Sequence, residues 1–363
     1  MKILIAMNKY PDNEGDKASM YVHTRCMCYL QNGIEIDVLK FTADKNYFID
    51  GVRVITLEEY TKRNDHYDLL IMHAATPKSH FKFIKEHGMK FSKFVFFFHG
   101  GEVFKVNKVY PKEYPYMKKP LYWNVAIDIR DIYKLIMWRR LISGIYEKSH
   151  FVFVSNWMKR EFFRWTNVNP SLLEDRVSVI YNCIGESFEK CRYDWGSEKK
   201  YDFITIRTNL DGSKYCIDVV TKLAYRNPTL EFLVIGKGRY YDQNQKPENL
   251  TWLDKTLGQS EIIDYLNIAR FALLPTRVDA QGVMACEIAS TGMPLITSAI
   301  DVCHEVFDDF KNVMFIQNDN PILPDLSDYS NKSKEAENTI SEKYHQRETC
   351  KKELDLFQRL CES

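Results

Sequence analysis

The sequence lacks any apolar run of about 18 residues, the length that a membrane-spanning helix needs. It also lacks a Cys-x-x-Cys pair, and its 9 cysteines are an odd number, so we expect a reduced chain rather than a disulfide framework or a zinc site. The apolar residues 2–7 are too short for a signal peptide and acidic residues follow them, so they predict a buried first strand. These absences lead us to expect a cytoplasmic protein.

Charge is small overall but unevenly distributed. The net charge is +1, yet residues 78–164 carry 18 Lys and Arg against 7 Asp and Glu. This excess predicts an anionic surface or substrate near residues 78–164, although a solvated basic face without a partner would give the same pattern. The length of 363 residues and the hydrophobic content of 45% allow two domains with substantial cores.

Strand-like apolar runs alternate with helical segments through most of the chain. We expect strands at residues 2–7, 34–39, 68–72, 93–98, 151–155, 177–181, 202–207, 231–235, 270–275 and 294–297. We expect helices at residues 18–30, 128–147, 216–225, 260–269 (with Ser260 as N-cap) and 282–290. The alternation predicts two doubly wound α/β domains with a ligand cleft between them. The predicted domains are residues 1–185 and 186–325, followed by a helical tail, residues 326–363, that packs on the body.

The stretch from Asp279 to Glu287 carries two carboxylates eight positions apart, and Gly282 between them opens a helix. The first backbone N–H groups of this helix, at Val283 and Met284, have no partner within the helix and can bind a phosphate. Glu287 lies about a turn and a half further along. A strand, an acidic loop and a helix that begins at glycine predict a nucleotide site.

Several segments, in order along the chain, resemble motifs of the retaining glycosyltransferases of family 4, which have the two-domain GT-B fold. They are residues 154–159, 179–184, 233–238, 258–269 and 279–294, together with the basic pair Arg207 and Lys214. The resemblance covers most of the chain. It implies two Rossmann-like domains facing across a cleft, the first binding the acceptor and the second a nucleoside-diphosphate sugar.

The resemblance also implies roles for particular residues. Arg207 and Lys214 would bind the donor diphosphate, the first as a bidentate fork and the second as a point charge. Glu287 would accept the two ribose hydroxyls, and Asp279 would lie near the transferred sugar. The family usually has Glu where this chain has Asp279, which shortens the reach of the carboxylate. The alternatives are a surface pair for the two cations and a solvated helix residue for Glu287.

Further candidates follow from strand ends and glycines. Gly236 and Gly15 are donor-binding candidates because the family has glycine-rich turns there, although a tight turn after a buried strand explains Gly236 as well. His99 follows the strand at residues 93–98, at the strand end where doubly wound sheets place ligands, and it could contact the reacting sugar. A histidine that caps the strand is the alternative. Glu102 is either an acceptor-side base or a loop acid.

Cofactors and partners are predicted as follows. No metal ion is expected, because no Asp-x-Asp follows a strand in suitable surroundings, and the resemblance favours a UDP-sugar as co-substrate. Residues 103–140 mix lysines and arginines with Tyr110, Tyr114, Tyr116, Tyr122 and Trp123, a composition that suits an anionic membrane surface. An ordinary acceptor loop is the alternative, and no nucleic-acid motif is present.

These observations predict a retaining hexosyltransferase that moves a sugar from a nucleoside-diphosphate sugar to a hydroxyl acceptor. The acceptor would be a growing surface polysaccharide or a lipid-linked glycan, which would place the protein at the inner face of the membrane. Two alternatives stay open: a nucleotide-sugar epimerase of the same fold, and a binding subunit without catalytic activity.

Overall fold

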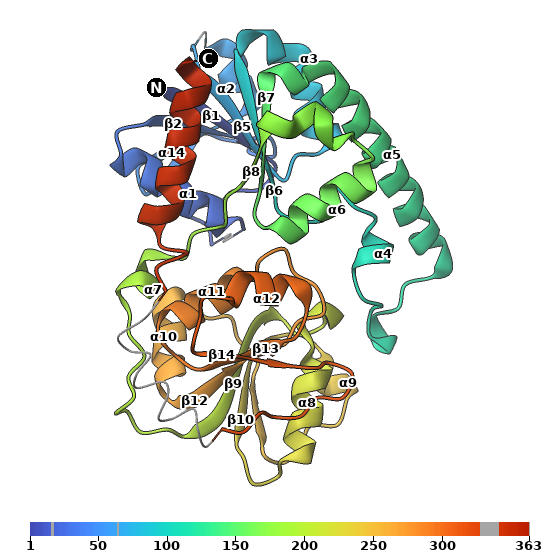
Figure 1. Cartoon of the computed structure of the whole chain (residues 1–363), viewed down its shortest axis with the longest axis vertical. Coiled ribbons are helices and arrows are strands. Elements are labelled where there is room, and N and C mark those ends of the chain that lie inside the picture. Colours follow the sequence, from blue (N-terminus) through green and yellow to red (C-terminus); the bar gives the residue numbers. More distant parts are fainter. Residues whose placement is uncertain (16–17, 64, 327–340, 363) are drawn as a thin grey trace. The chain divides into compact units, whose positions relative to one another are not determined.

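The computed structural model describes residues 1–15, 18–63, 65–326 and 341–362 (Figure 1). The chain divides into two compact units. Unit 1 contains residues 1–106, 126–183 and 343–363, and unit 2 contains residues 107–125 and 184–342. The change of unit after Cys183 lies close to the predicted boundary. The division differs from the prediction at residues 107–125, which group with unit 2, and at the end of the tail, which groups with unit 1.

Unit 1 is built on one eight-stranded sheet. Its strands are β1 (Lys2–Met7), β2 (Glu35–Lys40), β3 (Tyr47–Ile49), β4 (Val52–Ile55), β5 (Leu69–His73), β6 (Lys93–Phe98), β7 (Ser149–Phe153) and β8 (Val177–Val179). The spatial order is β3-β4-β2-β1-β5-β6-β7-β8, and all neighbours are parallel except β3 and β4. The chain leaves β1 for β2 on one side and continues at β5 on the other. The carboxyl ends of β1 and β5 therefore border the switch point where such sheets bind ligands.

The helices of unit 1 are α1 (Met20–Gln31), α2 (Leu57–Lys62), α3 (Lys82–His87), α6 (Asn156–Thr166) and α14 (Gln346–Glu362), together with most of α5 (Leu121–Ile145). The side chain of Ser155 caps α6 by accepting the backbone N–H of Met158. The strands β5, β6 and β7 are buried on both faces, as expected for parallel strands covered by helices.

Helix α14 is an integral part of unit 1 rather than a loose tail. Its Phe357 packs in the same core as β1, and its Glu353 forms a buried ion pair with Arg25 (2.7 Å between Oε1 and Nε). A disulfide joins Cys28 of α1 to Cys350 of α14. The expectation of a wholly reduced chain is therefore wrong for this pair, whose members stand 322 residues apart and share no local pattern. Residues 327–340 of the predicted tail lie outside the described residues.

Unit 2 has a second parallel sheet. Its strands are β9 (Tyr201–Asn209), β10 (Phe232–Lys237), β11 (Leu250–Leu253), β12 (Ala269–Leu273), β13 (Leu295–Ser298) and β14 (Val313–Ile316), in the order β11-β10-β9-β12-β13-β14. Its helices are α7 (Glu186–Lys190), α8 (Ile217–Arg226), α9 (Tyr240–Gln243), α10 (Gln259–Asn267), α11 (Val283–Ser290) and α12 (Asp301–Phe307), and the short α4 (Val106–Val109) lies at its border. The switch point of this sheet lies between β9 and β12.

The predicted elements occur, and the differences are local. Gly258 rather than Ser260 is the N-cap of α10, and the side chain of Glu261 accepts its backbone N–H. The short strands β3, β4, β11 and β14 were not predicted. Among the described residues, no helix combines the length and the apolar character needed to cross a bilayer.

Candidate functional site

A small pocket lies at the switch point of the unit 2 sheet. Its volume is about 150 Å³. The residues that line it are Arg207, Thr208, Tyr215, Asp279, Gly282, Val283 and Met284. Arg207 comes from the end of β9, and the residues from Asp279 onward follow β12. The fold thus brings together, from two strand ends, five of the residues predicted to bind the donor or to act on it.

Arg207 enters this pocket with an unsatisfied donor. Its side chain is 8% exposed, and one terminal nitrogen donates to the carbonyl oxygen of Pro275 at 2.8 Å. The buried Nε–H has no hydrogen-bond partner in the described structure. Burial lowers the pKa of Arg207, and the nearby Asp279 carboxylate opposes this shift. A buried donor without an acceptor is costly, so this N–H is a candidate donor for a ligand in the pocket.

The start of α11 faces the same pocket. Gly282 is the N-cap with φ of 78°, a left-handed conformation that glycine adopts without strain. The first helical hydrogen bonds go from Ala285 and Cys286 to the carbonyl oxygen of Gly282, which leaves the N–H groups of Val283 and Met284 outside the helical pattern. Two backbone donors and the positive end of the helix dipole are therefore available to bind an anion.

Asp279 is held by the loop that leads to α11. Its Oδ1 accepts the backbone N–H groups of Ala280 (2.8 Å) and Gln281 (3.4 Å). The Asp279 carboxylate also interacts with Arg207 and Lys214. Arg207 in the pocket and Lys214 beside it thus face one fixed carboxylate, which leaves a net positive charge for a ligand.

Lys214 stands beside the pocket rather than in its lining. Its Nζ lies 4.6 Å from the ring centre of Tyr215 and 5.8 Å from that of Tyr110. Burial alone would lower the pKa of Lys214, but Asp279, with the two tyrosines, leaves it above its ordinary value. Lys214 therefore stays protonated at neutral pH and can serve as a phosphate counter-charge.

Glu287 lies in the second turn of α11, outside the lining of the pocket. Its side chain is half-buried, and Oε1 accepts the backbone N–H of Gly185 at 3.3 Å. Removal from water raises the pKa of Glu287 to about 7, and the Gly185 hydrogen bond opposes this. A carboxyl that titrates near neutral pH is a feature of binding and catalytic sites. Its contact with ribose stays a prediction.

The two glycine candidates lie elsewhere. Gly236 does not line the pocket, and a Cβ there would come within 2.0 Å of the carbonyl oxygen of Arg207. The close approach of β9 therefore explains this glycine. Gly15 has φ of 106° and nothing within 4 Å of a Cβ placed there. Donor contact by either glycine stays a prediction.

In unit 1, His99 follows β6, and its ring is paired with a second histidine. The Nε2 of His99 lies 3.0 Å from Nδ1 of His73, the last residue of β5, and the rings stack. Burial lowers the pKa of both well below the ordinary value, so both are neutral at pH 7. Sequence reasoning missed His73, although its place at a strand end is the same signal that pointed to His99. The carboxylate of Glu102 accepts the backbone N–H of His99, which favours the loop-acid interpretation.

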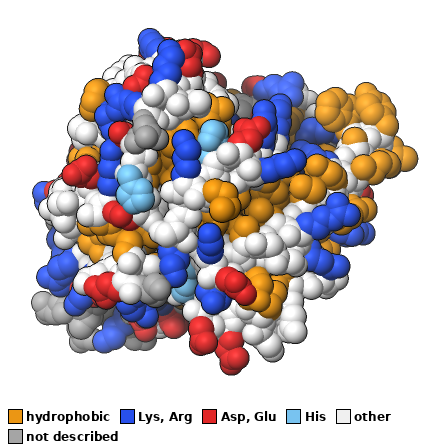
Figure 2. Space-filling view, turned by 90° about the horizontal axis from the view of Figure 1, so that it is seen from above, with side chains coloured by type: hydrophobic (Ala, Val, Ile, Leu, Met, Phe, Trp, Pro, Cys, Tyr) orange, Lys and Arg blue, Asp and Glu red, His pale blue; other side chains and the backbone are white. Residues whose placement is uncertain are grey.

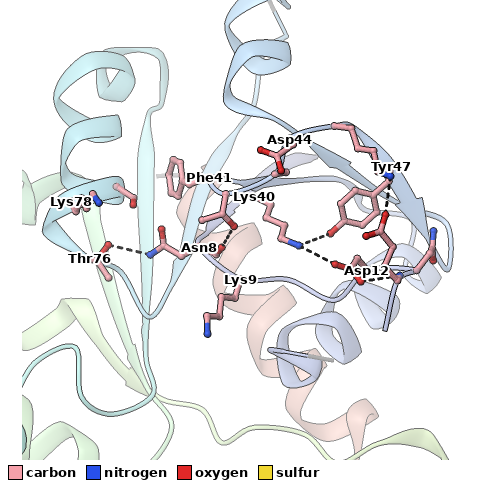
Figure 3. Close-up of a pocket in the computed structure, with 15 residues that line it drawn as sticks. Asn8, Lys9, Asp12, Lys40, Phe41, Asp44, Tyr47, Thr76 and Lys78 are labelled. Atoms are coloured by element: carbon pink, nitrogen blue, oxygen red, sulfur yellow. Dashed lines mark hydrogen bonds and ion pairs between the residues drawn. The ribbon is translucent and has the colours of Figure 1, made fainter. Parts of the chain in front are cut away.

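Figure 3 shows a larger pocket at the switch point of the unit 1 sheet, with a volume of about 1180 Å³. Asn8 follows β1 and donates through Nδ2 to Oγ1 of Thr76, which follows β5, at 3.2 Å. Lys40, at the end of β2, extends toward Asp12, with 3.6 Å between Nζ and Oδ2. Phe41 also lines the pocket. Polar groups beside an aromatic ring suit the hydroxyls and the apolar face of a sugar.

Comparisons with known proteins agree with this architecture. Residues 203–323 match the family described as Glycosyl transferases group 1, a segment that contains Arg207, Lys214, Asp279 and Glu287. No curated protein sequence matches the chain.

Similar solved structures cover nearly the whole chain. Sucrose-phosphate synthase from Thermosynechococcus elongatus has a TM-score of 0.72 at 12% identity, covering 99% of this chain and 98% of that one. A glycosyltransferase from Rickettsia africae has a TM-score of 0.65 at 13% identity, over 99% and 98% of the two chains. WaaG, a glycosyltransferase involved in lipopolysaccharide biosynthesis, has a TM-score of 0.63 at 12% identity, over 98% and 99%. The chain therefore has the GT-B fold, and the family match supports glycosyl transfer.

Proposed function

We propose that the protein is a retaining glycosyltransferase that takes its sugar from a nucleoside-diphosphate sugar, with UDP as the favoured nucleotide. The observation that carries the proposal is the unit 2 pocket at a switch point, which is lined by Arg207, with its unpartnered Nε–H, and by Val283 and Met284 at the start of α11. All three are donors for a diphosphate. The family match over residues 203–323 supports the same function.

In the proposed reaction, the bond between the sugar and the diphosphate breaks, and negative charge grows on the leaving oxygen. Arg207, Lys214 and the start of α11 stabilise this charge, because fixed donors in a site with little water act strongly on a developing charge. The acceptor hydroxyl attacks from the face that the leaving group vacates, and the leaving phosphate takes its proton. Arg207 and Lys214 supply the counter-charge, so the proposed reaction uses no metal ion. Glu287 binds the ribose, and Asp279 lies near the sugar.

A thermal-shift panel of nucleoside diphosphates and their sugars tests this proposal. A ligand at a hundredfold excess over its dissociation constant stabilises the folded state by about 2.7 kcal/mol. We expect UDP and a UDP-sugar to raise the melting temperature of the parent, and to do so far less in Glu287→Ala. If no nucleotide shifts the parent, the proposed function is wrong. Product analysis then separates transfer from the alternatives, because an epimerase changes the donor without an acceptor and a silent subunit leaves it intact.

For the acceptor, we propose a surface polysaccharide or lipid-linked glycan bound at the unit 1 pocket. His99 would donate to hydroxyls of the reacting sugar. Replacing Asn8 by alanine removes the side-chain bridge to Thr76 and should raise the KM for the acceptor while leaving that for the donor unchanged. An unchanged acceptor KM would remove this pocket from the proposal.

A membrane location is part of the proposal, but the structure changes which residues support it. Tyr114 is buried in the core of unit 2 and Tyr116 packs against that core, so these two tyrosines are not membrane contacts. The better support is the solvent-facing side of α5. Figure 2 shows hydrophobic side chains among Lys and Arg on the side where Figure 1 places this helix.

Helix α5 has two apolar faces. One is buried and carries Leu135, Trp138 and Ile142. The other is exposed: Leu121, Tyr122, Val125, Ile129, Ile132, Tyr133 and Ile136 are between 46% and 79% exposed. At about 100° per residue, these seven fall within a third of the helix circumference. Single exposed apolar residues are ordinary, but a continuous stripe indicates a contact surface.

Charges next to this stripe favour an anionic bilayer as its partner. Lys118 and Lys119 precede the helix, and Arg139 and Arg140 follow the stripe on the same side. Cations beside aromatic and aliphatic side chains suit the headgroup region of an anionic membrane.

Vesicle co-sedimentation tests the stripe with a matched pair of variants. Ile129→Asp changes a stripe residue that is 63% exposed, and Ile322→Asp changes an isoleucine of unit 2 that is 66% exposed. We expect the parent and Ile322→Asp to bind vesicles that contain phosphatidylglycerol, and Ile129→Asp to bind them weakly. Equal binding by all three proteins would contradict the proposal. A concentration-dependent dimer that Ile129→Asp dissolves would instead assign the stripe to a second copy of the chain.

A further inference from the structure

Residues 107–125, named the arm here, precede most of unit 1's helix α5 in sequence but belong to unit 2. The arm lies outside the matched segment 203–323. Its side chains are nevertheless built into the unit 2 core: Tyr114 is 9% exposed and its ring lies 5.0 Å from that of Tyr240. Tyr116 stacks on Tyr114 with 5.9 Å between ring centres. The arm is therefore a fixed part of unit 2.

Tyr114 connects the arm to Lys214 through two charged residues. Its hydroxyl donates to Oδ1 of Asp218 at 2.9 Å. The Asp218 carboxylate accepts both terminal nitrogens of Arg277, at 2.9 and 2.6 Å. Arg277 in turn donates to the carbonyl oxygens of two consecutive residues. Its guanidinium donates to that of Ser213 (2.7 Å), and its backbone N–H donates to that of Lys214 (2.9 Å). The hydroxyl of Tyr114 is thus linked, through Asp218 and Arg277, to the turn that carries Lys214.

Tyr116 fixes a second pair of loops beside the site. Its hydroxyl donates to Oδ1 of Asp211 at 2.8 Å, and the same oxygen accepts the backbone N–H of Arg239 at 2.9 Å. Asp211 belongs to the loop after β9, the strand that carries Arg207 near its end, and Arg239 follows β10. One carboxylate therefore joins the loops after two neighbouring strands, and Tyr116 holds this carboxylate in place.

We propose that the arm is a working part of the nucleotide-sugar site, in which Tyr114 and Tyr116 are positioning residues for Lys214 and the loop after Arg207. This inference rests on the proposed function, because it assigns those cations to the donor diphosphate. The affinity for a phosphate depends on the exact positions of the cationic side chains that bind it, because small displacements weaken charge-assisted hydrogen bonds. The arm contributes this placement without touching the diphosphate itself.

The test uses Tyr→Phe variants, which keep each ring and remove one hydroxyl. The variants are Tyr114→Phe, Tyr116→Phe and, as a matched control, Tyr225→Phe, whose hydroxyl donates to the carbonyl oxygen of Gln245 in the same unit at 3.1 Å. UDP affinity is measured by calorimetry on the full chain, with the melting temperature without ligand recorded alongside. We expect about a fivefold to tenfold loss of UDP affinity in each arm variant, from the loss of a hydrogen bond to a charged group, and none in the control.

Steady-state kinetics separate positioning from general destabilisation. In the arm variants the KM for the UDP-sugar should rise while the KM for the acceptor stays at the parent value. UDP affinity of Tyr114→Phe and Tyr116→Phe equal to that of Tyr225→Phe would overturn the inference. So would a loss that follows the melting temperature across all three variants. A parent that binds no nucleotide would instead refute the proposed function, which keeps the two failures distinguishable.

Discussion

Replacing Glu287 by glutamine gives the sharpest test of the donor site, because the structure predicts how the effect depends on pH. Removal from water raises the pKa of this carboxyl to about 7. Ribose hydroxyls that donate hydrogen bonds require the ionised form, which only accepts. With a pKa near 7, about a tenth of the protein carries the carboxylate at pH 6 and about nine tenths at pH 8.

The affinity for a UDP-sugar should therefore rise about tenfold between pH 6 and pH 8, equivalent to about 1.4 kcal/mol. A UDP-sugar is the right probe because its diphosphate is esterified at both ends and keeps a constant charge over this range. In Glu287→Gln, binding should be weaker and independent of pH. Glu248→Gln, at an exposed glutamate of the same unit, serves as the control and should follow the parent.

The stability of the folded parent should change with pH in the opposite direction to its UDP-sugar affinity: the Glu287 contribution falls as the pH rises. The folded pKa of Glu287 lies above that of an unfolded glutamate, so the folded state binds more protons between the two values. This contribution to stability is fully present below about pH 4.3 and is lost as the pH rises through about 7. Glutamine cannot ionise, so Glu287→Gln should be more stable than the parent at pH 8, by at most about 4 kcal/mol.

Calorimetric titrations at pH 6, 7 and 8 and thermal melts at pH 5 and 8 measure both effects. If Glu287 binds the ribose, Glu287→Gln must both bind the UDP-sugar more weakly and fold more stably at pH 8 than the parent. A parent whose affinity does not depend on pH would refute the reasoning, as would parallel pH curves for the parent and Glu287→Gln. Stability that falls in Glu287→Gln at pH 8 would contradict the cost assigned to the buried charge.

Three further outcomes follow from the same structure. Arg207→Lys removes the bidentate fork and the buried Nε–H, so the dissociation constant of UDP should rise by about tenfold to a hundredfold in calorimetry; an unchanged constant would exclude Arg207 from the phosphate site. Asp279→Asn keeps an oxygen that accepts the N–H groups of Ala280 and Gln281 but removes a negative charge that repels phosphate. The UDP affinity should therefore stay the same or improve, while kcat falls. An unchanged kcat would exclude a catalytic role for Asp279. Cys350→Ser should lower the melting temperature under non-reducing conditions, by the equivalent of about 2–4 kcal/mol, and make it insensitive to a thiol reductant, whereas a parent that also ignores the reductant would contradict the Cys28–Cys350 link.

Sequence reasoning succeeded where a segment's own pattern decides its structure. The strands at β1, β6 and β12 are apolar runs that are buried as predicted, and the stretch from Asp279 to Met284 forms the strand-to-helix turn that its glycine indicates. It failed where the position of a residue depends on a partner that is far away in the sequence. Nothing near Tyr114 shows that its hydroxyl meets Asp218, 104 residues away, so the tyrosine was placed with the interfacial aromatics. The arm, the disulfide and the ring pair of His73 and His99 share this dependence on partners far along the chain.

The glycine pattern after β10 shows how a motif can serve a site without touching the ligand. A side chain at Gly236 would collide with the carbonyl oxygen of Arg207 before it met any donor, so the glycine is required by the close approach of β10 and β9. That approach fixes the end of β9, and with it the guanidinium that carries the free Nε–H. Gly238 faces the backbone and carboxylate of Asp211, the residue that Tyr116 holds. Gly238 and the arm therefore contact the same residue of the loop after β9, Gly236 lies against Arg207, and a phosphate-binding turn is not needed to explain either glycine.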